Sequence, residues 1–105
     1  MIGTVLGGGT MPTSFDGAKD ITKDFVNNTW TAPSSGFLTV YLEPSNTTFG
    51  CLRYTRNDSQ LKGLCVNSTN GALNTGVMPV KKGDVIKRVL TMAVNAESIS
   101  FEAFE

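Results

Sequence analysis

Histidine is absent from this 105-residue sequence, and cysteine occurs only twice. Without histidine the chain lacks the commonest general base and metal ligand, which excludes Ser-His-Asp and Cys-His catalytic sites and histidine-ligated zinc. The two cysteines lack the close spacing of zinc ligands. A pair of carboxylates could act as acid and base, but the nine Asp and Glu residues give no sign along the sequence of facing each other across a cleft. We therefore expect no enzymatic activity, no metal and no cofactor.

Charged residues are scarce, at 17% of the chain, and the nine basic and nine acidic residues cancel. Proteins that bind polyanions need an excess of positive charge, so we expect no nucleic acid among the partners. No apolar run approaches the roughly 20 residues that span a bilayer, and the start of the sequence lacks the basic and apolar regions of a signal peptide. We expect no membrane insertion. The length fits one domain with a single core.

Glycine and threonine dominate residues 1–14, which we interpret as a flexible lead-in or linker, because the run Gly7-Gly8-Gly9 loses much entropy on ordering. Residues 15–105 then form the single domain. The segment 16–24 has mild helical character but contains β-branched residues, so that a turn and a strand fit equally well.

Turn residues and β-formers alternate along the rest of the chain, which is typical of an all-β protein. Phe37 and Tyr41 point to one side of the strand expected over 37–42, and Leu38, Val40 and Leu42 point to the other. Such a strand needs cover on both faces. A second sheet can cover one face and a neighbouring subunit the other, which makes Phe37 and Tyr41 candidate subunit-interface residues.

Near-regular strand spacing favours an antiparallel β-sandwich over any α/β arrangement. The turn cluster Pro33-Ser34-Ser35-Gly36 precedes the first long strand, and Gly36 permits a positive φ there. Asn57-Asp58-Ser59 has the composition of a tight hairpin turn, and Lys81-Lys82-Gly83-Asp84 forms a further turn. The expected strands cover residues 37–42, 48–55, 61–66, 77–80, 85–94 and 98–104.

The two cysteines, Cys51 and Cys65, are placed symmetrically about Asp58, since 58 − 51 and 65 − 58 are both 7. A regular hairpin would set them opposite each other. A cross-strand disulfide is therefore conceivable. Buried free thiols are the alternative, since free cysteine behaves as a small core residue and the absence of an export signal argues against an oxidising compartment. Both states remain open.

Recognition residues are sought among aromatic side chains with a polar group and on exposed turns. Trp30 and Tyr54 could stack on sugar rings or anchor an interface, although a Trp at the start of a core strand also serves packing. The hairpin tip offers a polar contact surface made of Arg53, Arg56, Asn57 and Asp58. The basic residues Lys81, Lys82, Lys87 and Arg88 are interpreted as a solvated loop and strand end.

Two motifs carry a resemblance to a known family. The run W-T-A-P-S-S-G-F-L begins at Trp30, and V-K-K-G-D-V-I begins at Val80. This pair resembles the turns of phage fibre tip and head-fibre domains with tumour-necrosis-factor-like architecture. There an aromatic residue and T-A-P-x-x-G precede the first long strand, and V-x-K-G-D-x-I precedes a late one. The resemblance covers most of residues 25–105, and the closing aromatic-Pro tail is replaced here by Phe101-Glu102-Ala103-Phe104-Glu105.

The resemblance implies a jelly-roll sandwich, a homotrimer and a place on a virion. Its function would be attachment to a host-surface glycan or protein, with other virion proteins as further partners. Two alternatives stay open. A carbohydrate-binding module of a secreted or cell-surface bacterial protein would be monomeric and would expose Trp30 or Tyr54. A capsid decoration domain would stabilise a shell without binding a receptor.

Overall fold

The computed structural model describes residues 4–5, 9–10 and 17–104. Most of the predicted lead-in, residues 1–14, therefore lies outside the described residues. Within it, Thr4–Val5 (β1) and Gly9–Thr10 (β2) pair antiparallel. In the described part of the chain no helix is long and apolar enough to span a membrane.

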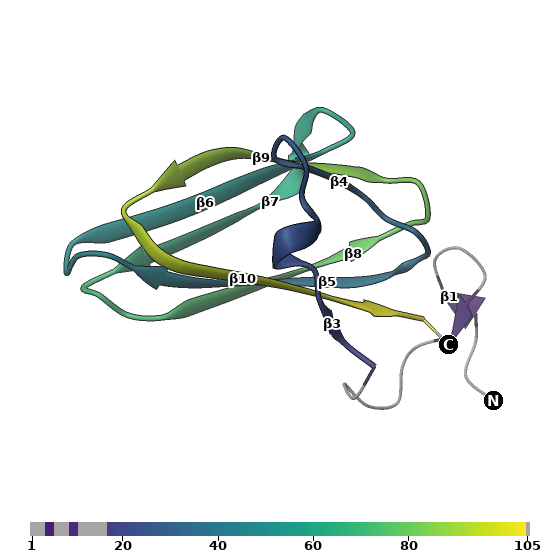
Figure 1. Ribbon diagram of the computed structural model, residues 1–105, viewed down its shortest axis with the longest axis horizontal. Coiled ribbons are helices and arrows are strands. Elements are labelled where there is room, and N and C mark those ends of the chain that lie inside the picture. The colour runs from purple at the N-terminus through teal and green to yellow at the C-terminus, as the bar shows by residue number, and fades with distance from the viewer. Residues whose placement is uncertain (1–3, 6–8, 11–16, 105) are drawn as a thin grey trace.

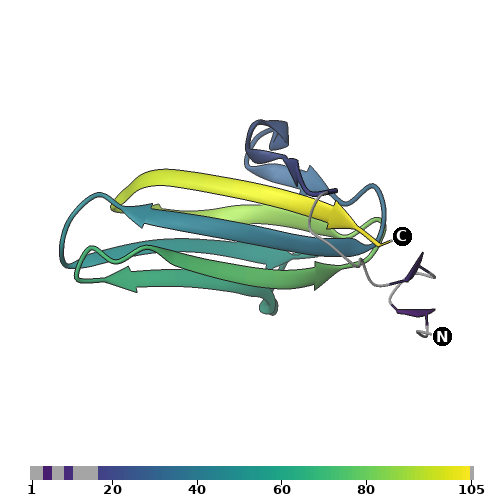
Figure 2. The same cartoon turned by 90° about the horizontal axis from the view of Figure 1, so that it is seen from below.

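Two four-stranded antiparallel sheets pack face to face, with strand orders β3-β10-β5-β8 and β4-β9-β6-β7 (Figures 1 and 2). Every connection from β3 to β10 except β6–β7 passes from one sheet to the other. The all-β antiparallel sandwich is thus confirmed, and segment 16–24 contributes a short strand and a 3-10 turn. The elements are β3 (Lys19–Asp20), η1 (Thr22–Asp24), β4 (Thr29–Thr31), β5 (Gly36–Pro44), β6 (Phe49–Arg56), β7 (Ser59–Thr69), β8 (Asn74–Val80), β9 (Val85–Met92) and β10 (Val94–Ala103).

The core lies between the sheets, and β5 shows how the sequence pattern builds it. Leu38, Val40 and Leu42 are fully buried on the inner face, while Phe37 and Tyr41 on the outer face are half-buried. Leu52, Ile86 and Ile99 complete the inner layer from β6, β9 and β10. Each such aliphatic side chain contributes about 1.5–3 kcal/mol on burial.

Tight turns join several strands as their residue types predict. Asn57 and Asp58, with φ of 52° and 63°, form the two-residue turn of the β6–β7 hairpin, and Gly83 has a φ of 90°. Gly36, which permits a positive φ, does not adopt one. Glycine is required there for space, because a Cβ would lie 2.2 Å from the backbone oxygen of Glu102 on the paired strand.

An irregularity interrupts the β6–β7 hairpin. Tyr54 faces Leu64 and Arg56 faces Ser59, so the single residue 55 opposes residues 60–63. Gly63 lies against β6, where a Cβ would come within 2.0 Å of the Tyr54 backbone oxygen. Leu61, in the middle of the insertion, is fully exposed.

This insertion shifts the register and makes the predicted pairing of the cysteines wrong. Cys51 faces Asn67, and Cys65 faces Arg53. Both cysteines are free thiols, but only Cys51 is buried, whereas Cys65 is exposed. Burial raises the pKa of Cys51, and the neighbouring Cys65 thiol raises it further.

Candidate functional site

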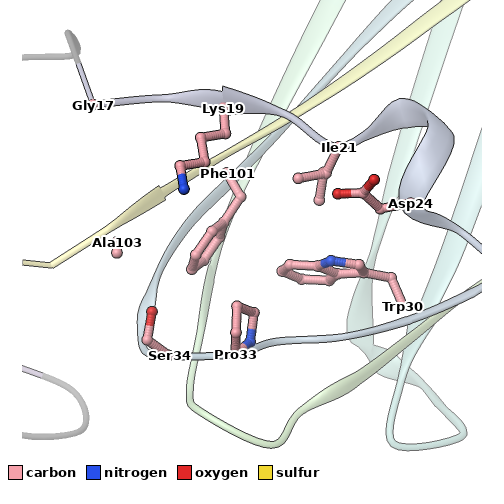
Figure 3. A pocket seen from close by; sticks show the side chains of 9 residues that line it. All are labelled: Gly17, Lys19, Ile21, Asp24, Trp30, Pro33, Ser34, Phe101 and Ala103. Atoms are coloured by element: carbon pink, nitrogen blue, oxygen red, sulfur yellow. The ribbon is translucent and has the colours of Figure 1, made fainter.

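A pocket of about 300 Å³ opens at the edge of the sandwich where β3 and η1 meet the turn before β5 (Figure 3). We call it the Trp30 pocket. Its floor is apolar, and polar side chains stand around it. The residues that line it are Gly17, Lys19, Ile21, Asp24, Trp30, Pro33, Ser34, Phe101 and Ala103.

Backbone and side-chain hydrogen bonds hold η1 beside this pocket. Ile21 donates its N–H to the Ile99 carbonyl at 2.8 Å, and the Thr22 hydroxyl accepts the Ile99 N–H at 2.9 Å. The Asp20 carboxylate in turn accepts the hydroxyl and the N–H of Thr22, at 2.6 and 2.9 Å. These bonds hold the pKa of Asp20 below its ordinary value. The start of the domain is thereby fixed to β10, although β3 itself has only two residues.

Trp30 forms the floor of the pocket together with Phe101 and Ile21, and each of the three is less than a tenth exposed. Phe25 stacks on the indole with ring centroids 6.2 Å apart, and Phe101 meets it edge to face at 5.2 Å. Trp30 therefore has the packing role that a Trp at the start of a core strand more often has, and it offers no open face on which a sugar ring could stack. Trp30 packs in the core and presents only a small part of its ring to the pocket.

Polar groups surround the floor. The Lys19 ammonium group lies on the same side of the pocket as Ser34, while the Asp24 carboxylate lies across from them, above the indole (Figure 3). Among the hydrogen bonds and ion pairs of the described residues, none uses the side chain of Lys19, Asp24 or Ser34, or the indole N–H of Trp30. Within the described part of the chain, these donors and acceptors are therefore left for a ligand.

Tyr54, the second predicted contact residue, is fully buried between the sheets and cannot touch a receptor. Its hydroxyl donates to the Glu97 carboxylate, which also accepts two hydrogen bonds from Arg88 at 2.9 and 2.8 Å. Arg88 further binds the Asn28 side chain at 2.7 Å. We call Tyr54, Arg88 and Glu97 the inter-sheet cluster, because Glu97 on β10 is joined to β6 and β9 of the other sheet.

The predicted solvated position of Arg88 is wrong, since its side chain is only 18% exposed within the inter-sheet cluster. Burial lowers the pKa of Arg88, but the hydrogen bonds and charge of Glu97 outweigh this effect and raise it. Burial, followed by the contact with Glu97, raises the pKa of Tyr54 far above its ordinary value. The tyrosine therefore stays protonated and the arginine charged at every physiological pH.

The hairpin tip divides into a bonded and a free part. Asn57 donates to the Asp84 carboxylate at 3.1 Å and accepts the Val85 N–H at 2.8 Å, while Arg56 donates to the Pro79 carbonyl at 2.7 Å. Arg56 and Asn57 thus bind the hairpin to the β8–β9 turn. Asn57 is also exposed, and the contact role of both residues stays a prediction. Asp58 is exposed, and Arg53 lies half-buried on the outer face beside Cys65.

Asp84 is the centre of this tip-to-turn contact. Its carboxylate also accepts the Lys81 N–H at 2.9 Å and lies 3.9 Å from the Arg56 guanidinium. Partial burial pushes the pKa of Asp84 upward, but these hydrogen bonds and the Arg56 charge outweigh burial and hold the pKa below its ordinary value. The motif around Gly83 indicated a turn, yet gave no sign that Asp84 would bind the hairpin.

The outer face of sheet β3-β10-β5-β8 carries the two candidate interface residues. Phe37 lies across from Pro79, and Tyr41 lies across from Thr75, on the edge strand β8. Phe104 contacts Phe37 edge to face at 5.1 Å. Val77 lies across from Thr39, which separates Phe37 from Tyr41 along β5, and is 57% exposed. A shallow groove runs over this face, lined by Ala18, Phe37, Thr39, Val77, Ser100 and Glu102.

In the described part of the chain no three His, Cys, Asp or Glu side chains come together to hold a metal ion. Of the predicted contact residues, Arg56, Asn57 and Asp58 lie together at the hairpin tip, Arg53 lies further along β6, and Trp30 and Tyr54 are buried in the core. Of these residues, only Trp30 lines the pocket, and its partners Lys19, Asp24 and Phe101 had no sequence signal, because they come from β3, η1 and β10. No protein-family model matches the sequence, and no curated protein is similar to it.

Proposed function

We propose that this chain is a non-catalytic domain of a bacteriophage virion, at a fibre or spike tip or in a head fibre. It assembles as a homotrimer and attaches the particle to a glycan or protein on the host surface. The strand orders favour jelly-roll topology for this domain, since a jelly roll is a double sheet in which the chain passes repeatedly between the layers.

The outer face of sheet β3-β10-β5-β8 is the observation that carries the proposed assembly. β5 lies inside its sheet, between β10 and β8, and still presents Phe37 and Tyr41 outward. Val77 on β8 is more than half exposed beside them. Contiguous apolar surface of this kind is typical of protein interfaces, so a second subunit would cover these side chains.

Sedimentation at micromolar concentration tests the assembly. The wild-type chain is expected to sediment as a trimer, and Val77→Asp as a monomer, because the new carboxylate would have to be buried unpaired in the interface. Val89→Asp is the matched control, since Val89 is also exposed but lies on the other sheet. A monomeric wild type, or a Val77→Asp variant that remains trimeric, contradicts the proposed interface.

Attachment is tested separately with labelled chain on host cells. We expect Asp58→Ala and Leu61→Ser, which change exposed residues of the hairpin tip, to fold as the wild type does. Loss of adhesion in either variant places the receptor contact at the tip. A trimer that adheres to no cell surface would favour the capsid decoration function instead.

A carbohydrate-binding module is the second candidate, and the Trp30 pocket favours it. Such modules combine an aromatic surface with polar groups that bind sugar hydroxyls. This pocket has the polar groups, whereas Trp30 and Tyr54 lack the exposure that this function predicts. This function predicts a monomer that binds oligosaccharides, so the sedimentation measurement separates it from the first proposal.

A further inference from the structure

The Trp30 pocket exposes too little of the indole for a sugar ring to stack on it. Phe25 stacks on Trp30 and Phe101 contacts it edge to face, so that only 8% of the residue is exposed. Pyranose rings that bind aromatic residues need an open ring face. What this floor can accept is a smaller apolar group, about the size of a methyl.

The polar groups around the floor include both hydrogen-bond donors and hydrogen-bond acceptors. Lys19 and the indole N–H of Trp30 are donors, the Asp24 carboxylate is an acceptor, and the Ser34 hydroxyl is both (Figure 3). One cation and one anion leave the rim without net charge. The pocket therefore favours a neutral ligand with its own donor and acceptor over a phosphate or an amine.

An acetamido group has these properties, since it joins a methyl, an N–H donor and a carbonyl acceptor. We propose that the Trp30 pocket binds the acetamido group of an N-acetylhexosamine, an assignment that rests on the proposed attachment to a host-surface glycan. The methyl lies on the floor made by Ile21, Trp30 and Phe101. Asp24 accepts the amide N–H, the carbonyl accepts a hydrogen bond from the indole or from Lys19, and the sugar hydroxyls face solvent.

Fluorescence titration of the recombinant chain tests this assignment directly, because Trp30 is the single tryptophan. The probes are N-acetylglucosamine, N-acetylgalactosamine, glucosamine and glucose. A ligand of this size is expected to bind with a Kd on the order of 1 mM. Both N-acetylated sugars should shift the Trp30 emission, and the two sugars without an acetamido group should bind at least about tenfold more weakly.

Two variants locate the binding. Asp24→Ala removes the acceptor and should weaken N-acetylglucosamine binding about tenfold, whereas Glu43→Ala, which removes a carboxylate near the C-terminal end of β5, away from the pocket, should leave the Kd unchanged. Ala103→Phe fills the pocket from an exposed position and should abolish binding without disturbing the core. Circular dichroism checks that each variant folds.

Three results overturn the assignment: no change in emission up to on the order of 50 mM sugar, equal affinity for glucose, or an unchanged Kd in Asp24→Ala. If the chain trimerises and adheres to host cells but binds no N-acetylhexosamine, the pocket assignment fails and the proposed function stands. If the chain binds these sugars but is a monomer and adheres to no host cell, the proposed function fails and the pocket assignment stands.

Discussion

Two polar regions lie side by side at the open edge of the sandwich and differ in how their charges are paired. Phe25 connects them, since it stacks on Trp30 and also contacts Tyr54 and the Arg88 guanidinium, with separations of 6.2, 6.3 and 5.5 Å. In the inter-sheet cluster, Glu97 is bound by both Tyr54 and Arg88. In the Trp30 pocket, Lys19 and Asp24 have no partner among the described residues.

The difference separates groups that hold the fold from groups that can bind a ligand. Removing one member of a buried pair leaves the other charge without a partner, which costs several kcal/mol. Removing an exposed charge changes the free energy of unfolding little, because water already solvates that charge in the folded protein. Substitutions in the two regions should therefore affect different properties of the protein.

The largest effect is expected for Glu97→Ala, which leaves Arg88 and the Tyr54 hydroxyl without their shared acceptor between the sheets. We expect a loss of about 3–5 kcal/mol in the free energy of unfolding. Urea denaturation followed by circular dichroism measures it. Glu43→Ala is the matched control, because Glu43 binds the exposed Asn95 amide and no other side chain among the described residues. The loss of stability in this variant should be below about 1 kcal/mol. Equal losses of unfolding free energy in both variants would show that the inter-sheet cluster stabilises the fold no more than an exposed hydrogen bond does.

A smaller, pH-dependent effect on stability is expected at Asp84. Like the inter-sheet cluster, the Asp84 carboxylate is hydrogen-bonded to other residues of the chain. Its pKa in the folded protein lies below the unfolded value of about 3.9, so its stabilisation is complete above that pH and is lost as the pH falls through the folded pKa. Asp84→Asn should cost about 1–2 kcal/mol at pH 7 and nothing near pH 2. Urea midpoints from pH 7 to 2 measure this, and a constant difference would contradict it.

The smallest effect on stability is expected in the Trp30 pocket. Lys19→Ala and Asp24→Ala should each change the free energy of unfolding by less than about 0.5 kcal/mol, because neither side chain has a partner among residues 17–104 that would be left unpaired. The same urea denaturation measures it. A loss above about 1 kcal/mol in either variant would place that residue with the structural groups.

Local signals predicted the strands and most turns, and they failed where distant segments meet. The hairpin turn at Asn57-Asp58 follows from residues that tolerate a positive φ. The cysteine register did not follow, because the insertion at residues 60–63 depends on β7 fitting against Tyr54. Alternation placed Tyr54 on a strand but could not show that Glu97, 43 residues away, would bind its hydroxyl in the core.

The sequence by itself determined the all-β sandwich, because alternating apolar residues and turn formers act within a few positions of one another. Only the tertiary structure decided which polar residues hold the fold and which are available to a ligand. Asn57 binds Asp84 from 27 residues away, and Arg88 binds Asn28 from 60 residues away. It also decided that Trp30 would share a pocket with Phe101. Pairing between distant strands depends on how the two sheets pack, and no local pattern encodes that packing.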